Sequence, residues 1–452
     1  MSDIKTPVLL YGLGKSGLAA LRLLKIMGVA VDQIDVVDEK ADEKSASIGN
    51  FNLAIHRQIP IDKHYQTLVV SPGVSLAKPE IKKLLNDGAQ LASEISLAVK
   101  FLKNEKIIGI TGSMGKSTTS ALIHCGIEKA GRSAFLGGNF GTPLADYVAD
   151  VLESKKSRDD FLVLELSSYQ LENSGDLALD LSVIVSLAPN HLERYESLDE
   201  YYNAKLSIIS RSRQAVIVGS QSPDLSSIVA DQVRMKRFVG NKKINVVASI
   251  NPENLARFKE VRNSLNKEPL LPGEHNQDNL LIATQVLKEL DLERGIFGLF
   301  EFPGLNHRLE NCGKVAGVQI FNDSKATSIS SVHRALETIM VAYPHIKIHC
   351  LVGGRDKKLP WHSLNDFKPL SKVDFYFFGE CAALARAASG ISAKEFAKLS
   401  DALMESSRNA KAGEIILLSP GGTSLDEFGN FEKRGDYFKI KIKELLSQGQ
   451  VK

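Results

Sequence analysis

The sequence predicts an α/β fold with parallel sheets, because strand-like and helical patterns alternate along nearly all of its 452 residues. Short apolar, β-branched runs separated by helical patterns are typical of sheets covered by helices. Three such runs, at 7–11, 106–111 and 346–352, lead directly into glycine-rich turns. Ligands of open α/β sheets bind beyond the carboxyl ends of strands, so each of these turns is a candidate site.

Polar breaks in the sequence predict three domains. The run Lys103-Asn104-Glu105-Lys106 separates a helical stretch from a fresh strand, and Pro303-Gly304-Leu305-Asn306 forms a second break. Cutting at these breaks gives pieces 1–103, 104–305 and 306–452, which agree with the usual domain size.

Composition excludes several classes of protein. The 56 Lys and Arg residues against 53 Asp and Glu give a net charge of +3, too small for a basic coat that binds nucleic acid. Four scattered cysteines without a Cys-x-x-Cys pair argue against a disulfide framework. The N-terminus lacks the pattern of a signal peptide, and no apolar run approaches the ~18 residues of a membrane span. We therefore expect a cytoplasmic protein without a membrane or nucleic-acid partner.

The second glycine-rich turn has the pattern of a phosphate loop. Residues 107–119 read Ile-Ile-Gly-Ile-Thr-Gly-Ser-Met-Gly-Lys-Ser-Thr-Thr, and a helix is predicted from there to about Ala130, before Gly131. Gly112 and Gly115 let backbone N–H groups point at phosphate oxygens, and the N-terminus of the helix favours anions. Lys116 would reach the β- and γ-phosphates, and the Ser117 hydroxyl could bind Mg²⁺. The alternative is a Gly-Lys-Ser turn that arose by chance.

An acidic residue supports the phosphate loop. The apolar strand 161–165 ends in Glu165, as expected of a carboxylate that holds the Mg²⁺ of a nucleotide directly or through water. A purely structural carboxylate is the alternative.

The first turn, Gly12-Leu13-Gly14-Lys15-Ser16-Gly17, follows a strand and opens a helix. Asp38 closes the next strand, about 20 residues later, as in the dinucleotide-binding fingerprint. This pattern predicts NAD binding. The same turn could hold another phosphate instead, such as that of a UDP-linked substrate.

A lysine on an apolar helix face is a further candidate. Ser197 and Glu200 form a capping-box pattern that starts a helix. Tyr201, Lys205 and Ile208 then share one face by their spacing. Lys205 on this face either extends its amino group toward water or takes part in chemistry.

Segments spread over the whole chain resemble the Mur ligase family, whose members make amide bonds on peptidoglycan precursors. The segments that carry the resemblance are 138–143 (Gly-Asn-Phe-Gly-Thr-Pro), 164–172 (Leu-Glu-Leu-Ser-Ser-Tyr-Gln-Leu-Glu), 190–195 (Asn-His-Leu-Glu-Arg-Tyr), 204–205, 273–279, 307–308, 322–327 (Asn-Asp-Ser-Lys-Ala-Thr) and 418–435.

This resemblance implies three domains: a Rossmann-like N-terminal domain for a UDP-linked substrate, a central P-loop ATPase domain with a parallel sheet, and a Rossmann-like C-terminal domain for an amino acid. The implied reaction phosphorylates the carboxylate of UDP-N-acetylmuramoyl-L-alanine with ATP. The amino group of D-glutamate then attacks the acyl-phosphate. The implied UDP replaces NAD as the ligand expected at the first turn. Residues implied to bind the UDP-linked substrate are Gly12, Gly14, Ser16, Asp38, Gly73, Asn139 and Ser167.

The resemblance also implies which residues contact ATP and glutamate. Expected ATP-binding residues are Gly112, Ser113, Met114, Gly115, Lys116, Ser117, Thr118, Asn276, Asn279, Arg308 and Asp323. The expected cradle for glutamate is Lys325, Thr327, Lys357, Ser424 and Phe431. For Asn276, capping of the following helix is the plain alternative.

Two Mg²⁺ ions are expected by the same resemblance. Ser117 and Glu165 would hold one, and His191 a second. Family members carry a carbamylated lysine at the position of Lys205, which would turn this cation into a metal ligand. Lys116, His191 and Lys205 are therefore the expected catalytic residues.

Other functions stay open from the sequence alone. The stretch 421–424, Gly-Gly-Thr-Ser, departs from the family pattern next to the expected glutamate cradle, which leaves L-glutamate as an alternative. A P-loop NTPase switch without an acceptor substrate, an NAD-dependent dehydrogenase and a folylpolyglutamate synthase are further alternatives. No symmetric interface is evident from the sequence, so we expect a monomer.

Overall fold

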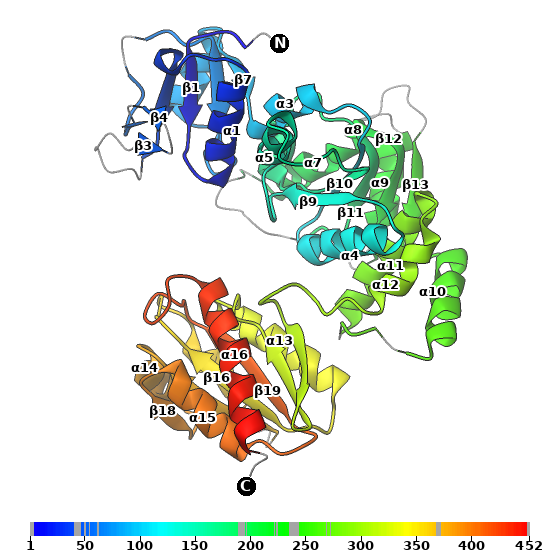
Figure 1. Cartoon of the computed structure of the whole chain (residues 1–452), viewed down its shortest axis with the longest axis vertical. Coiled ribbons are helices and arrows are strands. Elements are labelled where there is room, and N and C mark those ends of the chain that lie inside the picture. The colour runs from blue at the N-terminus through cyan, green and yellow to red at the C-terminus, as the bar shows by residue number, and fades with distance from the viewer. Residues whose placement is uncertain are drawn as a thin grey trace. The chain divides into compact units, whose positions relative to one another are not determined.

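The chain forms three large sheets with helices packed on their faces, as the computed structural model shows (Figure 1). The structure describes residues 4–39, 47–48, 51–53, 55–60, 63–188, 195, 197–220, 222, 225–234, 244–267, 269–271, 273–367 and 372–449. The chain divides into two compact units: Met1–Asn266 with Asp278–Leu299, and Lys267–Gln277 with Phe300–Lys452. The first unit contains two of the sheets and the second unit contains the third. The predicted α/β class is confirmed.

The first sheet is parallel, with the strand order β5-β2-β1-β6-β7 in the described residues. All residues of β1 and β6 are buried, as in a parallel sheet covered on both faces. The strands are β1 (Val8–Tyr11), β2 (Ile34–Val37), β5 (Ile55–His56), β6 (Thr67–Val70) and β7 (Gln90–Ala92). The helices of this part are α1 (Lys15–Ile26), α2 (Pro79–Asn86) and α3 (Glu94–Ala98).

The second sheet is also parallel and places β8 between β10 and β11, in the order β13-β12-β11-β8-β10-β9. Its strands are β8 (Lys106–Thr111), β9 (Ala134–Gly138), β10 (Phe161–Glu165), β11 (Leu179–Ile184), β12 (Ser212–Val218) and β13 (Asn245–Ala248). The helices are α4 (Lys116–Lys129), α5 (Leu144–Leu152), α6 (Ser168–Glu172), α7 (Leu198–Leu206), α8 (Ile208–Arg211), α9 (Leu225–Arg234), α10 (Pro252–Leu265), α11 (Glu274–Glu289) and α12 (Ile296–Leu299).

The third sheet is mixed, in the order β14-β15-β19-β16-β17-β18. Strand β14 runs antiparallel to β15 and the other described pairs are parallel. The antiparallel pair is a hairpin, closed at Ala316 and Gly317, both of which have positive φ. The strands are β14 (Glu310–Val315), β15 (Val318–Asn322), β16 (Ile348–Gly353), β17 (Val373–Phe378), β18 (Lys394–Phe396) and β19 (Ile415–Gly421). The helices are α13 (Ile329–Ala342), α14 (Ala382–Ser389), α15 (Leu399–Asn409) and α16 (Phe431–Gly449).

The three strands predicted before glycine-rich turns are present as β1, β8 and β16. Helix α4 ends at Lys129, and Gly131 has a φ of +82°, as the predicted stop requires. The predicted cap of α7 is also present, because the Ser197 side chain accepts from the Glu200 N–H at 3.1 Å.

Within the first unit, α1 of the first sheet packs against α5 of the second. Arg22 on α1 reinforces this contact, since its guanidinium lies 2.6 Å from Asp150 and 3.3 Å from Asp146 and also pairs with Glu153. Asp146 and Asp150 share one face of α5 by their spacing, and Glu153 is the C-cap residue of this helix. The two sheets are thus connected by packing and by charge as well as by the chain.

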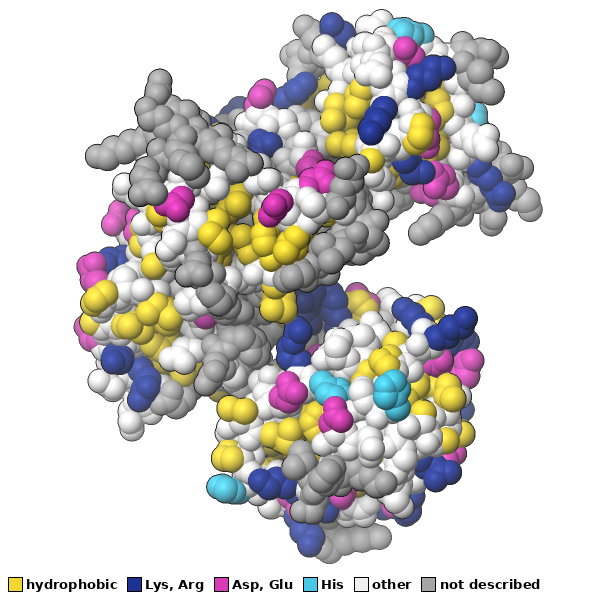
Figure 2. Space-filling model, turned by 180° about the vertical axis from the view of Figure 1, so that it is seen from behind, with side chains coloured by type: hydrophobic (Ala, Val, Ile, Leu, Met, Phe, Trp, Pro, Cys, Tyr) yellow, Lys and Arg dark blue, Asp and Glu magenta, His cyan; other side chains and the backbone are white. Residues whose placement is uncertain are grey.

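The surface and the cysteines agree with the composition. Acidic and basic side chains are interspersed on the face seen in Figure 2. The four cysteines are free thiols. In the parts of the chain that the structure describes, no helix has the length and apolar character needed to cross a membrane.

Gly17 in α1 provides a test of the first turn. A Cβ built on Gly17 would lie 1.9 Å from the carbonyl oxygen of Gly12, whereas one built on Gly73 would meet nothing within 4 Å. We expect Gly17→Ala to lower the free energy of unfolding by about 1–3 kcal/mol, as overpacking does. Gly73→Ala, the matched control, should leave the melting temperature nearly unchanged. Equal melting temperatures for both variants would contradict this packing.

Candidate active site

The phosphate loop lies at the carboxyl end of β8, before α4. Gly112 and Gly115 have φ values of +150° and +80°, which L side chains rarely adopt. A Cβ on Gly115 would also lie 2.8 Å from Oδ1 of Asn279. The predicted residues 112–118 therefore form one turn and the first turn of a helix, with Met114 exposed and Ser117 buried. Such a turn directs backbone N–H groups toward an anion.

A second loop, after the neighbouring strand β11, holds this turn in place. The Ser186 carbonyl accepts from Ser113 N at 2.8 Å, and the Ser186 hydroxyl accepts from Met114 N at 3.0 Å. The Ser113 hydroxyl in turn donates to the Ala188 carbonyl at 2.8 Å. Sequence reasoning missed Ser186, which could be found only by knowing that β11 lies next to β8.

Two lysine amino groups meet at one backbone oxygen of the loop. The Nζ atoms of Lys116 and Lys205 donate to the Gly112 carbonyl at 2.7 Å and 2.9 Å. Lys205 is 2% exposed, and its Nζ lies 4.8 Å from the centre of the Tyr201 ring. Burial, together with the nearby Lys116 charge, lowers the pKa of Lys205 to about 7, against the opposing effect of Glu165. Lys205 is therefore a partly neutral amine at neutral pH.

Glu165 ends β10 beside the loop, as predicted, and is 2% exposed. Its Oε1 accepts from Nδ2 of Asn139 at 2.7 Å. Its Oε2 is buried, and no described residue hydrogen-bonds to it. An unsatisfied buried carboxylate oxygen requires an explanation, and a hard cation such as Mg²⁺ would satisfy it. The residues present therefore fit Mg²⁺.

Of the metal ligands implied by the sequence, the structure describes Ser117, Glu165 and Lys205 but not His191. Ser117 lies in the first turn of α4, directly after the loop, and Glu165 ends the neighbouring strand β10. Among the residues with a described position, no three His, Cys, Asp or Glu side chains cluster as a metal site. Oxygens of a bound nucleotide would thus have to complete the coordination. His191 lies outside the described residues.

Helix α11 borders the loop from another side. Asn279 accepts from the Thr119 hydroxyl at 3.1 Å. Asp278, which sequence reasoning missed, accepts from Ser220 and Ser249 after β12 and β13, at 2.8 and 2.9 Å from their hydroxyls. Asn276 does not cap α11, because the helix begins at Glu274 and Asn276 lies within its first turn. The capping alternative is wrong.

The first glycine turn is held by its neighbours in the first sheet. Gly12 has a φ of +96°, and the Ser71 hydroxyl donates to its carbonyl at 2.8 Å. Asp38 accepts from Leu13 N at 2.8 Å through Oδ2. Gly14 is the N-cap residue of α1, and Ser16 lies in its first turn. The acidic residue thus closes the turn, and the N-terminus of α1 adjoins it.

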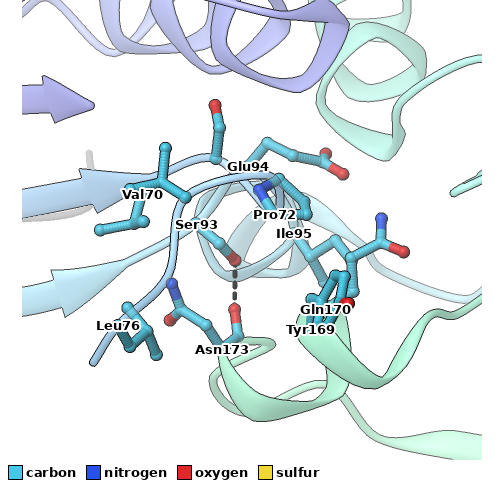
Figure 3. A pocket seen from close by; sticks show the side chains of 11 residues that line it. Val70, Pro72, Leu76, Ser93, Glu94, Ile95, Tyr169, Gln170 and Asn173 are labelled. Carbon is cyan, nitrogen blue, oxygen red and sulfur yellow. Dashed lines mark hydrogen bonds between the residues drawn. The ribbon is translucent and has the colours of Figure 1, made fainter. Parts of the chain in front are cut away.

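A cleft lies between the loop after β6 and helix α6, within the first unit (Figure 3). Ser71 and Pro72, next to Gly73, lie on one side, and Tyr169 and Gln170 of α6 on the other. The Ser93 hydroxyl donates to the Asn173 carbonyl across the cleft. Ser167, a predicted substrate contact, caps α6 by accepting from Gln170 N at 3.3 Å. The loop after β6, whose Ser71 hydrogen-bonds to Gly12 of the first turn, and helix α6 therefore line one cleft.

Glu94 lines this cleft and is 2% exposed. Its Oε2 accepts from Ala145 N at the start of α5, at 3.0 Å. Its Oε1 has no hydrogen-bond partner among the described residues. Burial raises the pKa of Glu94 to about 7, although the Ala145 N–H opposes this effect.

In the second unit, the predicted residues surround the carboxyl ends of β15, β19 and β16, which are neighbours in the sheet. Nζ of Lys325 lies 5.0 Å from the centre of the Phe431 ring. Asp323 accepts from Leu309 N and from the Ser419 hydroxyl, both at 3.0 Å, and burial raises the pKa of Asp323 to about 7. The predicted residues placed around this edge are Arg308, Asp323, Lys325, Thr327, Lys357, Ser424 and Phe431.

Arg434 of α16 is a residue that sequence reasoning missed at this edge. It is 0% exposed. Its guanidinium donates to the Ser324 hydroxyl at 3.1 Å, to the Ser324 carbonyl at 2.9 Å and to the Gly422 carbonyl at 3.2 Å. Arg434 thereby ties the loop after β15 to the loop after β19, which carry Lys325 and Ser424.

Comparison with known proteins gives one consistent result. Residues 110–287 match the Mur ligase middle domain. The UDP-N-acetylmuramoylalanine–D-glutamate ligases of Acidobacterium capsulatum and Streptococcus mutans are each 31% identical to the chain. These alignments cover 96% and 98% of the chain and 95% and 98% of the relatives.

Solved structures with the same fold are also found. The UDP-N-acetylmuramate-alanine ligase of Thermotoga maritima matches 99% of the chain and all of its own length, with a TM-score of 0.52 at 15% identity. The MurF ligase of the same organism, in complex with ADP, matches 85% of the chain and 96% of its own length, with a TM-score of 0.53 at 16% identity. These structural matches show the fold.

Glu94 gives a prediction about stability. Because the folded-state pKa of about 7 exceeds the ordinary value of 4.5, the free energy of unfolding should fall as the pH rises from about 4.5 to 7. Glu94→Gln removes the charge and should stabilise the protein by about 1–2 kcal/mol at pH 8 but not at pH 5. Thermal melts at both values test this expectation, and a variant that is less stable at pH 8 would contradict it.

Proposed function

The chain belongs to the Mur ligase family, and from this premise we propose that it uses ATP to join D-glutamate to UDP-N-acetylmuramoyl-L-alanine. The full-length relatives bear the name of this activity. The observation that carries the proposal is the buried Lys205 amino group 2.9 Å from the Gly112 carbonyl of the phosphate loop. A phosphate loop alone fits any P-loop NTPase, whereas a buried second lysine fits a site that must also hold a reacting carboxylate.

The reaction proceeds in two balanced steps. A carboxylate oxygen of UDP-N-acetylmuramoyl-L-alanine attacks the γ-phosphorus of ATP, which forms the acyl-phosphate and releases ADP. The amino nitrogen of glutamate then attacks the acyl carbon, so that the amide C–N bond forms, phosphate leaves and a proton is lost. Three anionic groups meet in the first step, and Lys116 with the loop N–H groups offsets their repulsion.

We include Mg²⁺ in the proposal because the oxygen donors at the site suit this ion. Ser117 and Glu165 would hold one ion, and His191 and Lys205 are proposed for a second. Bound Mg²⁺ neutralises phosphate charge and polarises the transferred group. Glu165 supports this role because its Oε2 is buried and free of any described hydrogen-bond partner.

Lys205 is proposed to be carbamylated. An amine with a pKa of about 7 is largely neutral just above neutrality and can attack CO₂. In that step an N–C bond forms and the nitrogen loses a proton, which leaves an anionic carbamate. The product removes one of two neighbouring positive charges and supplies oxygen ligands that suit Mg²⁺. The close approach of Lys116 and Lys205 to one carbonyl favours this conversion.

We propose a division of labour among residues 1–103, 104–305 and 306–452. The first part, with Gly12, Gly14, Ser16, Asp38 and Gly73, would bind the UDP group. Asn139 and Ser167 would continue that site. In support, the cleft of Figure 3 is lined both by Ser71, which hydrogen-bonds to Gly12, and by Tyr169 of α6. The amino acid would bind among Lys325, Thr327, Lys357, Ser424 and Phe431.

ATP is proposed to contact the following set: residues 112–118, Asn276, Asn279, Arg308 and Asp323. We further propose that the protein acts in the cytoplasm as a monomer, where its small-molecule substrates would be available. L-glutamate as substrate and a nucleotide switch without an acceptor are the alternatives that an assay must distinguish.

The assay measures phosphate release with ATP, UDP-N-acetylmuramoyl-L-alanine and either enantiomer of glutamate. We expect release to require both the UDP-linked substrate and glutamate, with D-glutamate favoured at least about tenfold. Mass spectrometry should detect the amide product. Release that does not depend on the UDP-linked substrate would favour the nucleotide switch. Faster turnover of L-glutamate would mean that the amino-acid substrate is the L enantiomer, and the ligase reaction itself would stand.

Lys205→Ala tests the carbamate. We expect its activity to fall at least about 100-fold, as losses of single electrostatic groups do, and to recover in part with added short carboxylates. Lys205→Arg is the matched control, because it keeps a cation but cannot be carbamylated in this way, and it should stay inactive. Full activity of Lys205→Arg, or no rescue of Lys205→Ala, would contradict the carbamate.

A further inference from the structure

Asn139 follows the edge strand β9 and faces the end of β10. Its backbone N–H donates to the Glu165 carbonyl at 2.8 Å, and its side-chain Nδ2 donates to Glu165 Oε1 at 2.7 Å. The turn itself is fixed, since Gly138 N donates to the Thr142 carbonyl at 3.0 Å. A Cβ on Gly138 would lie 2.3 Å from the Glu165 carbonyl oxygen. Two hydrogen bonds and a close backbone approach thus fix Asn139 against Glu165.

The chemistry of the pair settles how the amide is oriented. A carboxylate only accepts hydrogen bonds, so the NH₂ group of Asn139 must face Glu165 and Oδ1 must face away. Asn139 is exposed whereas Glu165 is buried. No described residue donates to Oδ1 of Asn139. This oxygen is therefore an acceptor without a described partner, on an exposed residue.

The same contact decides which oxygen of Glu165 is available. Oε1 is held by the amide, while Oε2 has no described partner. A carboxylate without the amide could rotate and divide its population between orientations, which would weaken any ligand that needs Oε2 in one place. Partners that orient metal ligands typically contribute 10–100-fold to metal affinity.

We infer that Asn139 is a positioning residue that couples the two ligands of the site: Nδ2 presents Glu165 Oε2 to Mg²⁺, while Oδ1 accepts from an amide or hydroxyl donor of the UDP-linked substrate. This inference rests on the proposed function for its substrate half. Because coupling is reciprocal, the UDP-linked substrate tightens metal binding by the same factor by which the metal tightens substrate binding.

Mn²⁺ serves as the spectroscopic probe. Its binding to the full chain is measured by electron paramagnetic resonance with a non-hydrolysable ATP analogue, with and without UDP-N-acetylmuramoyl-L-alanine. Asn139→Ala should weaken Mn²⁺ binding about tenfold and abolish the tightening by the substrate. Asn139→Ser is the second variant: like Asn139→Ala it keeps the backbone hydrogen bond but loses the amide, and it should weaken Mn²⁺ binding as well. Asn263→Ala on the exposed side of α10 is the control that should bind as wild type.

A double-mutant cycle shows whether Asn139 acts through Glu165. Glu165→Gln should weaken Mn²⁺ binding, and adding Asn139→Ala should then have little further effect, because the two changes share one interaction. Additive losses, or unchanged Mn²⁺ affinity in both Asn139 variants, would overturn the positioning role. If the Asn139 variants bind Mn²⁺ more weakly but the substrate does not change Mn²⁺ affinity in wild type, the coupling would be overturned and the positioning role would stand. Absence of phosphate release in the assay above would separately overturn the proposed reaction.

Discussion

Two cationic side chains on one backbone oxygen, in a site largely shielded from water, form the interaction on which the central site depends. Lys116 and Lys205 both donate to the Gly112 carbonyl. Two full positive charges that share one acceptor oxygen repel each other strongly in a medium less polarisable than water. The site lowers this repulsion through the reduced pKa of Lys205, and it can lower it further by binding anions. The phosphate loop is thus built to be completed by phosphate and carboxylate groups.

The order of strands in the second sheet assembles these groups. Strands β10, β8 and β11 are neighbours, and their carboxyl ends bring Glu165, the phosphate loop and Ser186 to one edge. Helix α7 then supplies Lys205 from a sequence position far beyond the loop. No local segment contains the site. The parallel sheet brings functional groups spread over about 90 residues of chain together at one edge, as open α/β sheets do.

Features that depend on local sequence could be predicted: the phosphate loop, Glu165 at the end of its strand and the Ser197 cap all have short-range causes. Contacts that depend on the order of strands in the sheet could not be predicted from the sequence. Ser186, Asp278 and the hydrogen bond between Asn139 and Glu165 require knowing which strands are neighbours, which periodicity does not reveal. Asn276 fails as a cap for a local reason, because α11 begins two residues earlier, at Glu274.

Two buried cations show why each residue type suits its place. Arg434 and Lys205 both donate to backbone carbonyls, and burial lowers the pKa of each, to about 10 and about 7. Arg434 therefore stays charged at neutral pH, and its planar guanidinium spans two loops at once. Lys205 is partly neutral, so its nitrogen has an electron pair available for reaction. Exchanging the two residue types would lose the clamp in one unit and the reactive amine in the other.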